Sequence, residues 1–380
     1  MATLAQIRFH EAMRRLLEAG VSGGVFPGGA AATSFYQDGG LILAEGAAGK
    51  LSLEGGSTGV RSDTIYDLAS ITKSFVAVAA LVAAERGQLD LDCPGERVIG
   101  DLRGGVAADI TLRQLLAHRA GLSAWGGLFL DLPHALGSPA ARRWIVGEAA
   151  RRREWPSDER IEYSDLGYIV AGAMISAMAG APLDRVIAEN VPGPLGIRQE
   201  VFYLGGSGAP PRTIVARRIA PTERCDFRGR IIRAEVHDEN AAAMGGIAGH
   251  AGLFGTARGV AVFARALLDV IALRSDLFPR EALLRALEPQ EGSSYRLGFD
   301  GKSEKGSSAG LRMDPSAFGH LGFTGTSFWC DPRRDLAIVL LTNRVHPSRA
   351  NKKIVGFRPA FHDGIVGVFD ALFERQASNA

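Results

Sequence analysis

The chain has 380 residues, of which 22% are charged, and its formal net charge is +2. This length suits one large or two interleaved domains with a substantial core, and it argues against extended disorder. A net charge this small gives no long-range field of the kind that attracts nucleic acid or an anionic membrane. The composition therefore favours a small ligand, and no nucleic-acid partner is expected.

Glycine and cysteine usage narrows the class further. The 48 glycines are about 13% of the chain, against a usual ~7%, and they follow no three-residue period, which indicates many tight turns rather than a fibre. Cys93, Cys225 and Cys330 lie far apart, without metal-ligand or redox spacing. We interpret them as structural thiols in a reducing compartment.

The sequence predicts neither a signal peptide nor a membrane span. Charged residues interrupt the apolar positions of residues 1–20 and leave the rhythm of an amphipathic helix. The longest apolar run, residues 75–84, has ten residues, about half of the ~20 that a span requires. We therefore expect a cytoplasmic protein with a buried helix at this run. Its oligomeric state is left open.

The first half of the chain changes from strands to helices. After the first helix, residues 28–35 and 40–48 are predicted to be two strands joined by a turn. Apolar residues at helical spacing then mark four segments: residues 70–86, 111–118, 139–153 and 166–178.

The second half returns to strands. Residues 193–229 are rich in glycine, proline and arginine and are predicted to be irregular, while a glycine-dense loop at 245–255 leads into a helix at 259–273. Two strands and a closing helix are predicted in the last quarter: residues 321–330, 335–342 and 354–374.

Strands at both ends of the chain around a helical block predict an α+β fold. We expect residues 1–69 and 290–380 to build one antiparallel sheet flanked by helices. Residues 70–289 are expected to form a mostly helical domain with cleft-lining loops. A ligand cleft is expected between the two parts.

Ser70 and Lys73 are the one pair in which a serine precedes a lysine by three residues. The pair stands at the start of the long apolar helix, so both side chains share one face, a turn apart. A serine hydroxyl is a poor nucleophile until a base takes its proton, and a desolvated amine can do so. An N-cap serine beside a solvated lysine is the alternative interpretation of the same pattern.

Two further segments could serve the same chemistry. Tyr163 precedes a glycine-containing helix, and a tyrosine near a lysine can pass a proton to a leaving group; an ordinary loop tyrosine is the alternative. His320 is expected to open a strand with glycine beside it. An exposed strand edge of this kind can offer a backbone N–H to a developing oxyanion.

Other candidate motifs fail on context. The Gly-x-Ser-x-Gly pattern around Ser57 matches the nucleophile elbow of α/β-hydrolases, but no buried strand precedes it, so a flexible loop is the better interpretation. The eight histidines show no metal-ligand spacing. Residues 237–239 could touch a metal, but a loop or cleft wall is favoured. No metal or cofactor is expected.

In their order along the chain, the boxes at Ser70, Tyr163 and His320 resemble the serine β-lactamase and penicillin-binding-protein superfamily. The resemblance is to the branch of class C β-lactamases, D,D-carboxypeptidases and esterases, and it covers most of the chain. It implies that Ser70 is acylated, that Lys73 and Tyr163 move protons, and that the N–H groups of Ser70 and Phe323 form the oxyanion hole. The groups expected to contact the substrate or the oxyanion are Asp165, His320, Gly322, Phe323 and Thr324.

Two positions depart from the family pattern. Asp165 stands where the family often has asparagine, and its carboxylate favours the ammonium form of Lys73, so Tyr163 is expected to take more of the base role. His320 replaces a lysine common in true β-lactamases. With an ordinary pKa near ~6.5, it is expected to be neutral at about pH 8 and cationic towards about pH 5.5, where it would meet a substrate carboxylate.

The expected function is that of a metal-independent serine hydrolase that acts through an acyl-enzyme. Its expected substrate is a small-molecule ester, amide, β-lactam or short peptide, and the lost lysine favours esters, amides or peptides over penicillins. The alternative is a non-catalytic penicillin-binding or sensor-type protein that is acylated without turnover.

Overall fold

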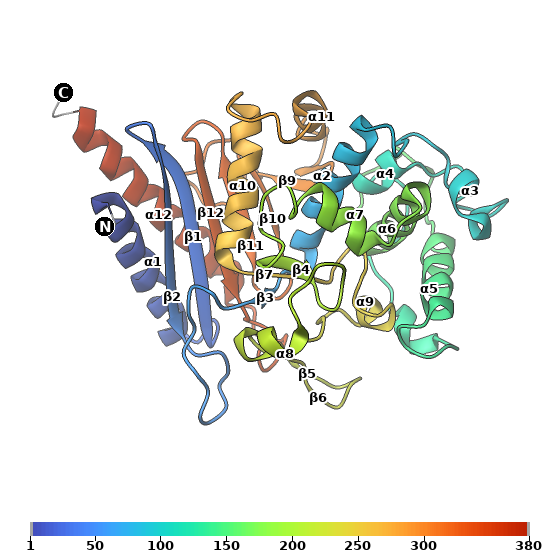
Figure 1. Ribbon diagram of the computed structural model, residues 1–380, viewed down its shortest axis with the longest axis horizontal. Helices are drawn as coiled ribbons and strands as arrows, with labels where there is room; N and C mark the ends of the chain where they lie inside the picture. The colour runs from blue at the N-terminus through green and yellow to red at the C-terminus, as the bar shows by residue number, and fades with distance from the viewer. Residues whose placement is uncertain (1–2, 378–380) are drawn as a thin grey trace.

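A seven-stranded sheet crosses one half of the molecule in the computed structural model, which describes residues 3–377 (Figure 1). Its order is β2-β1-β12-β11-β10-β9-β8, and neighbouring strands pair antiparallel. The strands are β1 Gly28–Gln37, β2 Gly40–Gly49, β8 Tyr295–Arg296, β9 Phe299–Gly301, β10 Phe318–Leu321, β11 Ser327–Asp331 and β12 Leu336–Thr342. The α+β fold with an antiparallel sheet is confirmed.

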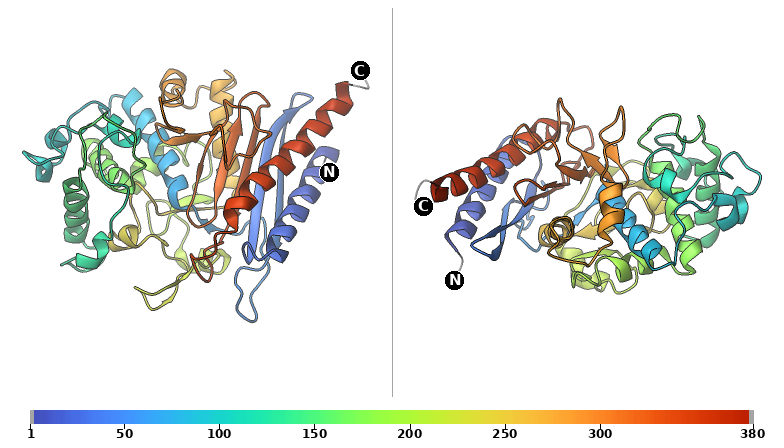
Figure 2. Two further views of the ribbon diagram at one scale, coloured as in Figure 1. Left: turned by 180° about the vertical axis from the view of Figure 1, so that it is seen from behind. Right: turned by 90° about the horizontal axis from the view of Figure 1, so that it is seen from above.

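The two ends of the chain meet in the middle of this sheet. β1 pairs with β12, with Gly29 opposite Thr342. Every residue of β12 is buried, because helices cover both faces of the sheet, and such a strand is expected to be apolar throughout. Helices α1 Leu4–Ser22 and α12 Ile354–Ala377 lie on one face, as Figure 2 shows from behind.

Helix α10, Ala257–Ile271, covers the opposite face of the sheet. Its buried stripe includes Val260, Phe263 and Leu267, and this spacing turns one apolar side toward β1, β11 and β12. The sequence analysis had grouped this helix with the helical part of the chain. In the structure it packs against the sheet instead, because its apolar stripe contacts β1, β11 and β12.

The helical part is built around α2, Thr72–Glu85, in which residues 72–83 are all buried. A helix that is apolar all round is expected in a core, where other helices surround it. The other helices of this part are α3 Gly95–Val98, α4 Leu112–Leu116, α5 Pro139–Arg151, α6 Asp165–Ala179, α7 Leu183–Asn190, α9 Glu239–Ala243 and α11 Arg280–Ala286, and α6, α7 and α11 pack against α2.

Short strands lie between the two parts. A three-stranded sheet has the order β3-β7-β4, with β3 Tyr66–Asp67, β4 Val201–Tyr203 and β7 Leu253–Gly255. A small hairpin follows, formed by β5 Arg224–Cys225 and β6 Arg230–Ile231, and α8 Arg212–Val215 precedes it. The segment predicted to be irregular, residues 193–229, thus contains β4, α8 and β5.

The predicted strand at residues 321–330 is wrong at its start. β10 ends at Leu321 and β11 begins at Ser327, so the intervening residues form a turn. Gly325 has φ +111°, a conformation open to glycine but not to residues with a side chain. At Gly322, an added Cβ would lie 1.9 Å from Thr326 Oγ1. The glycines therefore serve a turn at the end of β10.

Among residues 3–377, no single helix combines the length and the apolar character that crossing a membrane requires. The helices α6 and α7 reach that threshold only when taken together, and they are bent by 79° with respect to each other.

Phe75 of α2 stacks on Phe263 of α10, with ring centroids 3.9 Å apart, and thereby joins the helical part to the sheet. Both rings are fully buried. We expect Phe263→Ala to lower the free energy of unfolding by about 3–5 kcal/mol, because it leaves a cavity at this joint. Urea denaturation would measure the change. The exposed-loop variant Leu311→Ala is the control, and a cost below about 1 kcal/mol for Phe263→Ala would show that the joint does not depend on this ring.

Candidate active site

Ser70 lies in the short 3-10 helix η1, Ala69–Ile71, directly before α2. The preceding residue, Ala69, has φ +48°, a left-handed conformation that residues with a side chain rarely adopt. The chain therefore turns sharply out of β3 before it enters the helix. This turn puts Ser70 at the N-terminal end of α2, where the helix dipole favours developing negative charge.

Lys73 is the fully buried cation of this region. Its Nζ donates hydrogen bonds to Ser70 Oγ at 2.8 Å, to Asp165 Oδ1 at 2.6 Å and to the carbonyl oxygen of His250 at 3.2 Å. Three acceptors match the three N–H bonds of an ammonium group. The structure thus brings Ser70, Lys73 and Asp165 together. His250 is not among the predicted site residues, and its part here comes from its backbone.

The ring of Tyr163 closes over this group. Lys73 Nζ lies 4.8 Å from the centre of the ring, and the rings of His118 and Tyr295 pack against it at 4.7 and 5.1 Å. Burial raises the pKa of Tyr163 well above its ordinary value, Asp165 raises it further, and a hydrogen bond with Ser70 opposes the shift. The phenol is therefore neutral at rest.

The first turn of α6 places Asp165 beside Lys73. Ser164 caps this helix, its hydroxyl accepting a hydrogen bond from the Gly167 N–H at 2.8 Å. The Asp165 N–H donates to the carbonyl of Ala124 at 2.8 Å. These two hydrogen bonds fix the first turn of α6, and they thereby hold the Asp165 carboxylate in place beside Lys73.

The structure corrects the predictions that were made for the position and the charge of His320. It lies near the end of β10 rather than at the opening of a strand, and it is 3% exposed. Burial, with the nearby positive charge of Lys73, lowers the pKa of His320 to about 3. The expected titration near pH ~6.5 is therefore wrong, since the imidazole stays neutral across the physiological range. A substrate carboxylate has to find its positive charge elsewhere.

The turn that follows His320 is hydrogen-bonded to residues 67–70, which we call the nucleophile turn because they carry the predicted nucleophile Ser70. The hydroxyl of Thr324 donates to the Asp67 carbonyl at 2.7 Å, and that of Thr326 donates to the Leu68 carbonyl at 3.1 Å. An added Cβ at Gly322 would lie 2.5 Å from the Leu68 oxygen. The side chain of Thr324, expected to contact substrate, is therefore committed to the backbone of the protein and buried.

A pocket of about 630 Å³ opens over this group. Ser70, Tyr163 and Asp165 line it, and Gly322 and Phe323 form part of one wall. His320 and Thr324 are not among the residues that line it. A larger cavity of about 820 Å³ lies between the C-terminal half of α2, α4 and α11, and it contains none of the predicted site residues.

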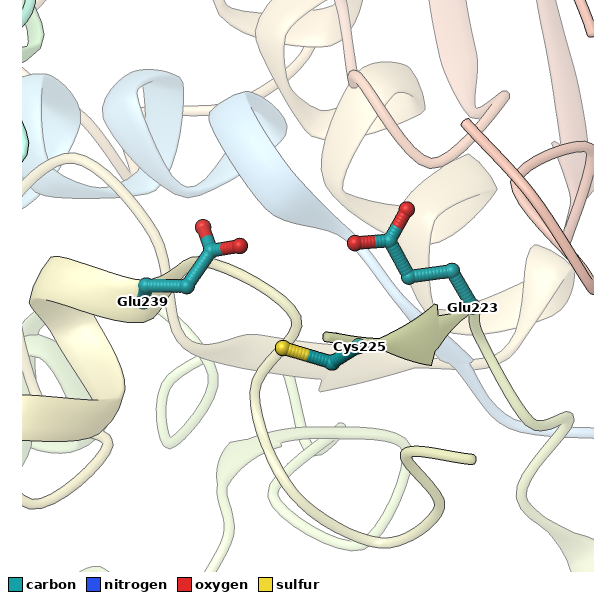
Figure 3. A group of neighbouring side chains, drawn as sticks. All are labelled: Glu223, Cys225 and Glu239. Atoms are coloured by element: carbon teal, nitrogen blue, oxygen red, sulfur yellow. The ribbon is translucent and has the colours of Figure 1, made fainter. Parts of the chain in front are cut away.

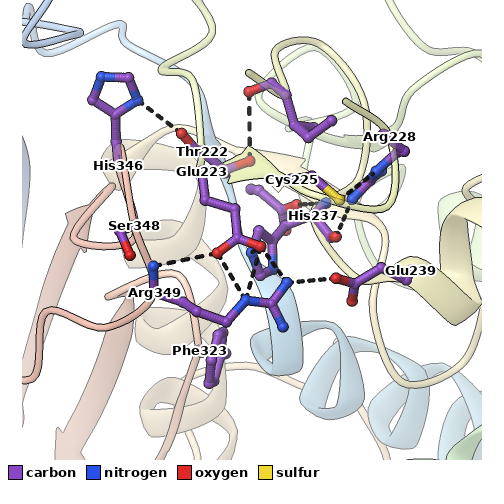
Figure 4. A network of polar contacts seen from close by, with 12 residues as sticks. Thr222, Glu223, Cys225, Arg228, His237, Glu239, Phe323, His346, Ser348 and Arg349 are labelled. Atoms are coloured by element: carbon purple, nitrogen blue, oxygen red, sulfur yellow. Dashed lines mark hydrogen bonds and ion pairs between the residues drawn. The ribbon is translucent and has the colours of Figure 1, made fainter. Parts of the chain in front are cut away.

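An ion-pair cluster stands at the mouth of the pocket. The guanidinium of Arg349 binds the carboxylates of both Glu223 and Glu239 (Figure 4). His237 Nε2 lies 3.3 Å from Glu223 Oε1. Burial alone would raise the pKa of Glu223, but the nearby His237 and the hydrogen bonds from Arg349 bring it down to about 2. The segment 237–239 is thus a cleft wall, as the sequence analysis favoured.

The same cluster has the spacing of a cation site. Ligand atoms of Glu223, Cys225 and Glu239 lie within 4.8 Å of one another (Figure 3). The guanidinium of Arg349 already lies between the two carboxylates, however, and forms an ion pair with each of them (Figure 4). We therefore describe the cluster as an ion-pair network.

The lowered pKa of His320 links stability to pH. The folded protein keeps this ring neutral, whereas the unfolded chain protonates it below about pH 6.5, so stability is lost as pH falls from about 6.5 towards about 3. We expect His320→Gln to lose about 1 kcal/mol less stability than the unchanged protein between about pH 7.5 and about pH 5.5. Urea denaturation at the two pH values would measure the difference. Equal losses would contradict a neutral, buried His320.

Known proteins resemble this chain along most of its length. A family model described as Beta-lactamase matches residues 13–356. A Salmonella agona (strain SL483) protein named "Putative D-alanyl-D-alanine carboxypeptidase" is 27% identical over 327 residues, which are 77% of this chain and 72% of the relative.

Solved structures extend the likeness to the fold. A crystal structure of SurE has a TM-score of 0.69 at 25% identity, covering 95% of this chain and 77% of SurE. EstCE1, a hydrolase with promiscuous acyltransferase activity, has a TM-score of 0.71 and covers 95% of this chain and 100% of its own. At 19% identity, EstCE1 resembles this chain in fold alone.

Proposed function

The chain belongs to the β-lactamase family and is a serine hydrolase, and from this premise we propose that it cleaves an amide or ester bond close to a free carboxylate. In this proposal the substrate is a small molecule or short peptide that enters the pocket over Ser70. The activity is then of the carboxypeptidase kind, which agrees with the name of the Salmonella relative.

Unneutralised positive charge on one pocket wall carries the proposal. Arg344, Lys352 and Arg358 line this wall, and none of them forms an ion pair within the described part of the chain. Each carboxylate that lines the pocket already has a partner, because Asp165 pairs with Lys73, Glu239 shares Arg349 with Glu223, and Asp238 Oδ1 lies 2.8 Å from His250 Nε2. An anionic group on the substrate would complete the balance of charge.

Backbone contacts hold two of these cations next to Phe323. Arg344 Nε donates to the Phe323 carbonyl at 2.9 Å, and Arg358 Nη2 donates to the carbonyls of Gly322 at 2.6 Å and Thr326 at 2.9 Å. Burial lowers the pKa of Arg358 to about 9, so its charge persists at neutral pH. This wall can supply the positive charge that the neutral His320 does not.

The proposed acyl transfer uses the contacts around Ser70. Ser70 Oγ attacks the substrate carbonyl carbon, and its proton passes to the Tyr163 oxygen while the tyrosine gives its own proton to the leaving nitrogen or oxygen. The C–N or C–O bond breaks, and the acyl group remains on Ser70. This concerted exchange suits a phenol that is neutral at rest.

Charge in the proposed reaction is stabilised from two sides. Lys73, paired with Asp165, supplies a fixed positive charge beside the serine oxygen. The backbone N–H groups of Ser70 and Phe323 are proposed to receive the carbonyl oxygen as it becomes negative. Water then releases the acyl group by the reverse sequence of proton transfers.

The first test concerns the nucleophile. We expect Ser70→Ala to abolish ester and peptide hydrolysis by several orders of magnitude while the fold is retained, because every covalent step passes through this oxygen. Ser57→Ala is the matched control and should leave rates within a few-fold. Turnover and intact mass would be followed together. Near-normal turnover in Ser70→Ala would exclude Ser70, and labelling of the unchanged protein without turnover would favour the non-catalytic alternative.

The second test concerns the substrate carboxylate. We expect the protein to hydrolyse a peptide with a free C-terminal D-residue at lower KM than its C-terminal amide. Lys352→Met should raise KM for the free acid about tenfold, corresponding to about 1.4 kcal/mol, and should leave the amide unaffected. Lys353→Met is the control, since this neighbour donates to the Gly23 carbonyl and does not line the pocket. Equal effects on acid and amide would contradict the proposed recognition.

A further inference from the structure

We infer that Asp67 is a positioning residue, whose buried carboxylate holds the nucleophile turn in the conformation that presents Ser70. The inference rests on the proposed role of Ser70. Asp67 ends β3, three residues before the serine, and it is 2% exposed. Its Oδ1 accepts a hydrogen bond from the Ala69 N–H at 2.8 Å, and its Oδ2 accepts one from the His237 N–H at 2.7 Å.

The hydrogen bond to Ala69 acts on the strained residue of the turn. Ala69 adopts φ +48° although it carries a Cβ, and such a conformation persists only where its surroundings hold it. The carboxylate of Asp67 accepts a hydrogen bond from the N–H of Ala69, two residues later in the chain, as in an Asx turn. Ser70 follows directly, so the direction of its Cα–Cβ bond depends on this hydrogen bond.

The second oxygen of the carboxylate ties the turn to the opposite wall of the pocket. His237 precedes α9, and its ring stacks on that of Phe323, with centroids 5.6 Å apart. Thr324 holds the Asp67 carbonyl from the same wall. Asp67 is thus fastened to both sides of the space between Ser70 and Phe323, where the oxyanion is proposed to lie.

Both hydrogen bonds require a carboxylate rather than an acid or an amide. Each oxygen faces an N–H donor, so a proton on either oxygen would set donor against donor. Within the described residues, Asp67 forms no ion pair, and the charged or titratable groups that act on it are His237 and Asp238. Burial raises its pKa above the ordinary value, and the two N–H groups oppose the rise.

Asp67→Asn keeps the size of the side chain and loses one of the two hydrogen bonds. We expect it to slow acylation of Ser70 by a neutral active ester by about 30- to 100-fold, measured by intact mass, with KM changed less than about threefold. Adding Ala69→Gly should recover about tenfold, because glycine adopts φ +48° without strain. A residue needed only for stability would give no such recovery of rate.

Thr33→Val is the matched control, since it removes a buried hydrogen bond to the Ala337 carbonyl in the sheet, far from the turn. It should lower stability and leave acylation within about twofold. A rate loss for Asp67→Asn no greater than for this control, or no recovery with Ala69→Gly, would overturn the inference.

A further test uses the unchanged protein, so it does not depend on the folding of a variant. Its acylation rate with the neutral ester should fall on acidification, because protonation of the Asp67 carboxyl, whose pKa burial raises, breaks one hydrogen bond, and a rate that does not change on acidification would overturn the inference. If Ser70 of the unchanged protein is not labelled at all, the proposed function fails. If it is labelled equally with and without Asp67→Asn, only the positioning role fails.

Discussion

The buried ammonium of Lys73 is the interaction on which the site depends. A cation with no solvent contact has to be matched on every N–H bond, or the fold would carry the cost of an unpaired charge. Ser70, Asp165 and the His250 carbonyl meet that need, and they come from three segments far apart in the chain. The requirement to satisfy one side chain therefore brings the parts of the pocket together.

The need to pair the buried ammonium of Lys73 also affects the charges of the other residues in the pocket. Burial, together with the positive charge of Lys73, keeps the imidazole of His320 neutral, and the carboxylate of Asp165 is paired with Lys73. Among the described residues that line the pocket, the cations without an ion pair, Arg344, Lys352 and Arg358, lie on the wall formed by the residues after β12. In the proposed function, the cations that would bind the substrate anion and the groups around Ser70 therefore lie on different walls of the pocket.

Much of this could be predicted because the signals are local. The apolar pattern of α2, the β1–β2 hairpin and the ordered boxes around Ser70, Tyr163 and His320 are each contained in a short stretch of sequence. The pKa of His320 was missed because burial is a property of the assembled fold. The hydrogen bond between Asp67 and His237 joins residues 170 positions apart, and nothing in either segment signals it. Helix α10 was misplaced because its apolar stripe does not say which surface it covers.

The pairing of β1 with β12 has a consequence for how the protein becomes active during its synthesis. The first strand emerges from the ribosome early, yet its central partner is made only when more than four-fifths of the chain exists. Thr324 and Thr326, which fasten the nucleophile turn, also belong to that late segment. A nascent chain that already contains Ser70 and Lys73 therefore lacks the contacts that shape the turn. The hydrogen bonds from Thr324 and Thr326 to the turn before Ser70 can therefore form only late in synthesis, and a product truncated before them would lack them.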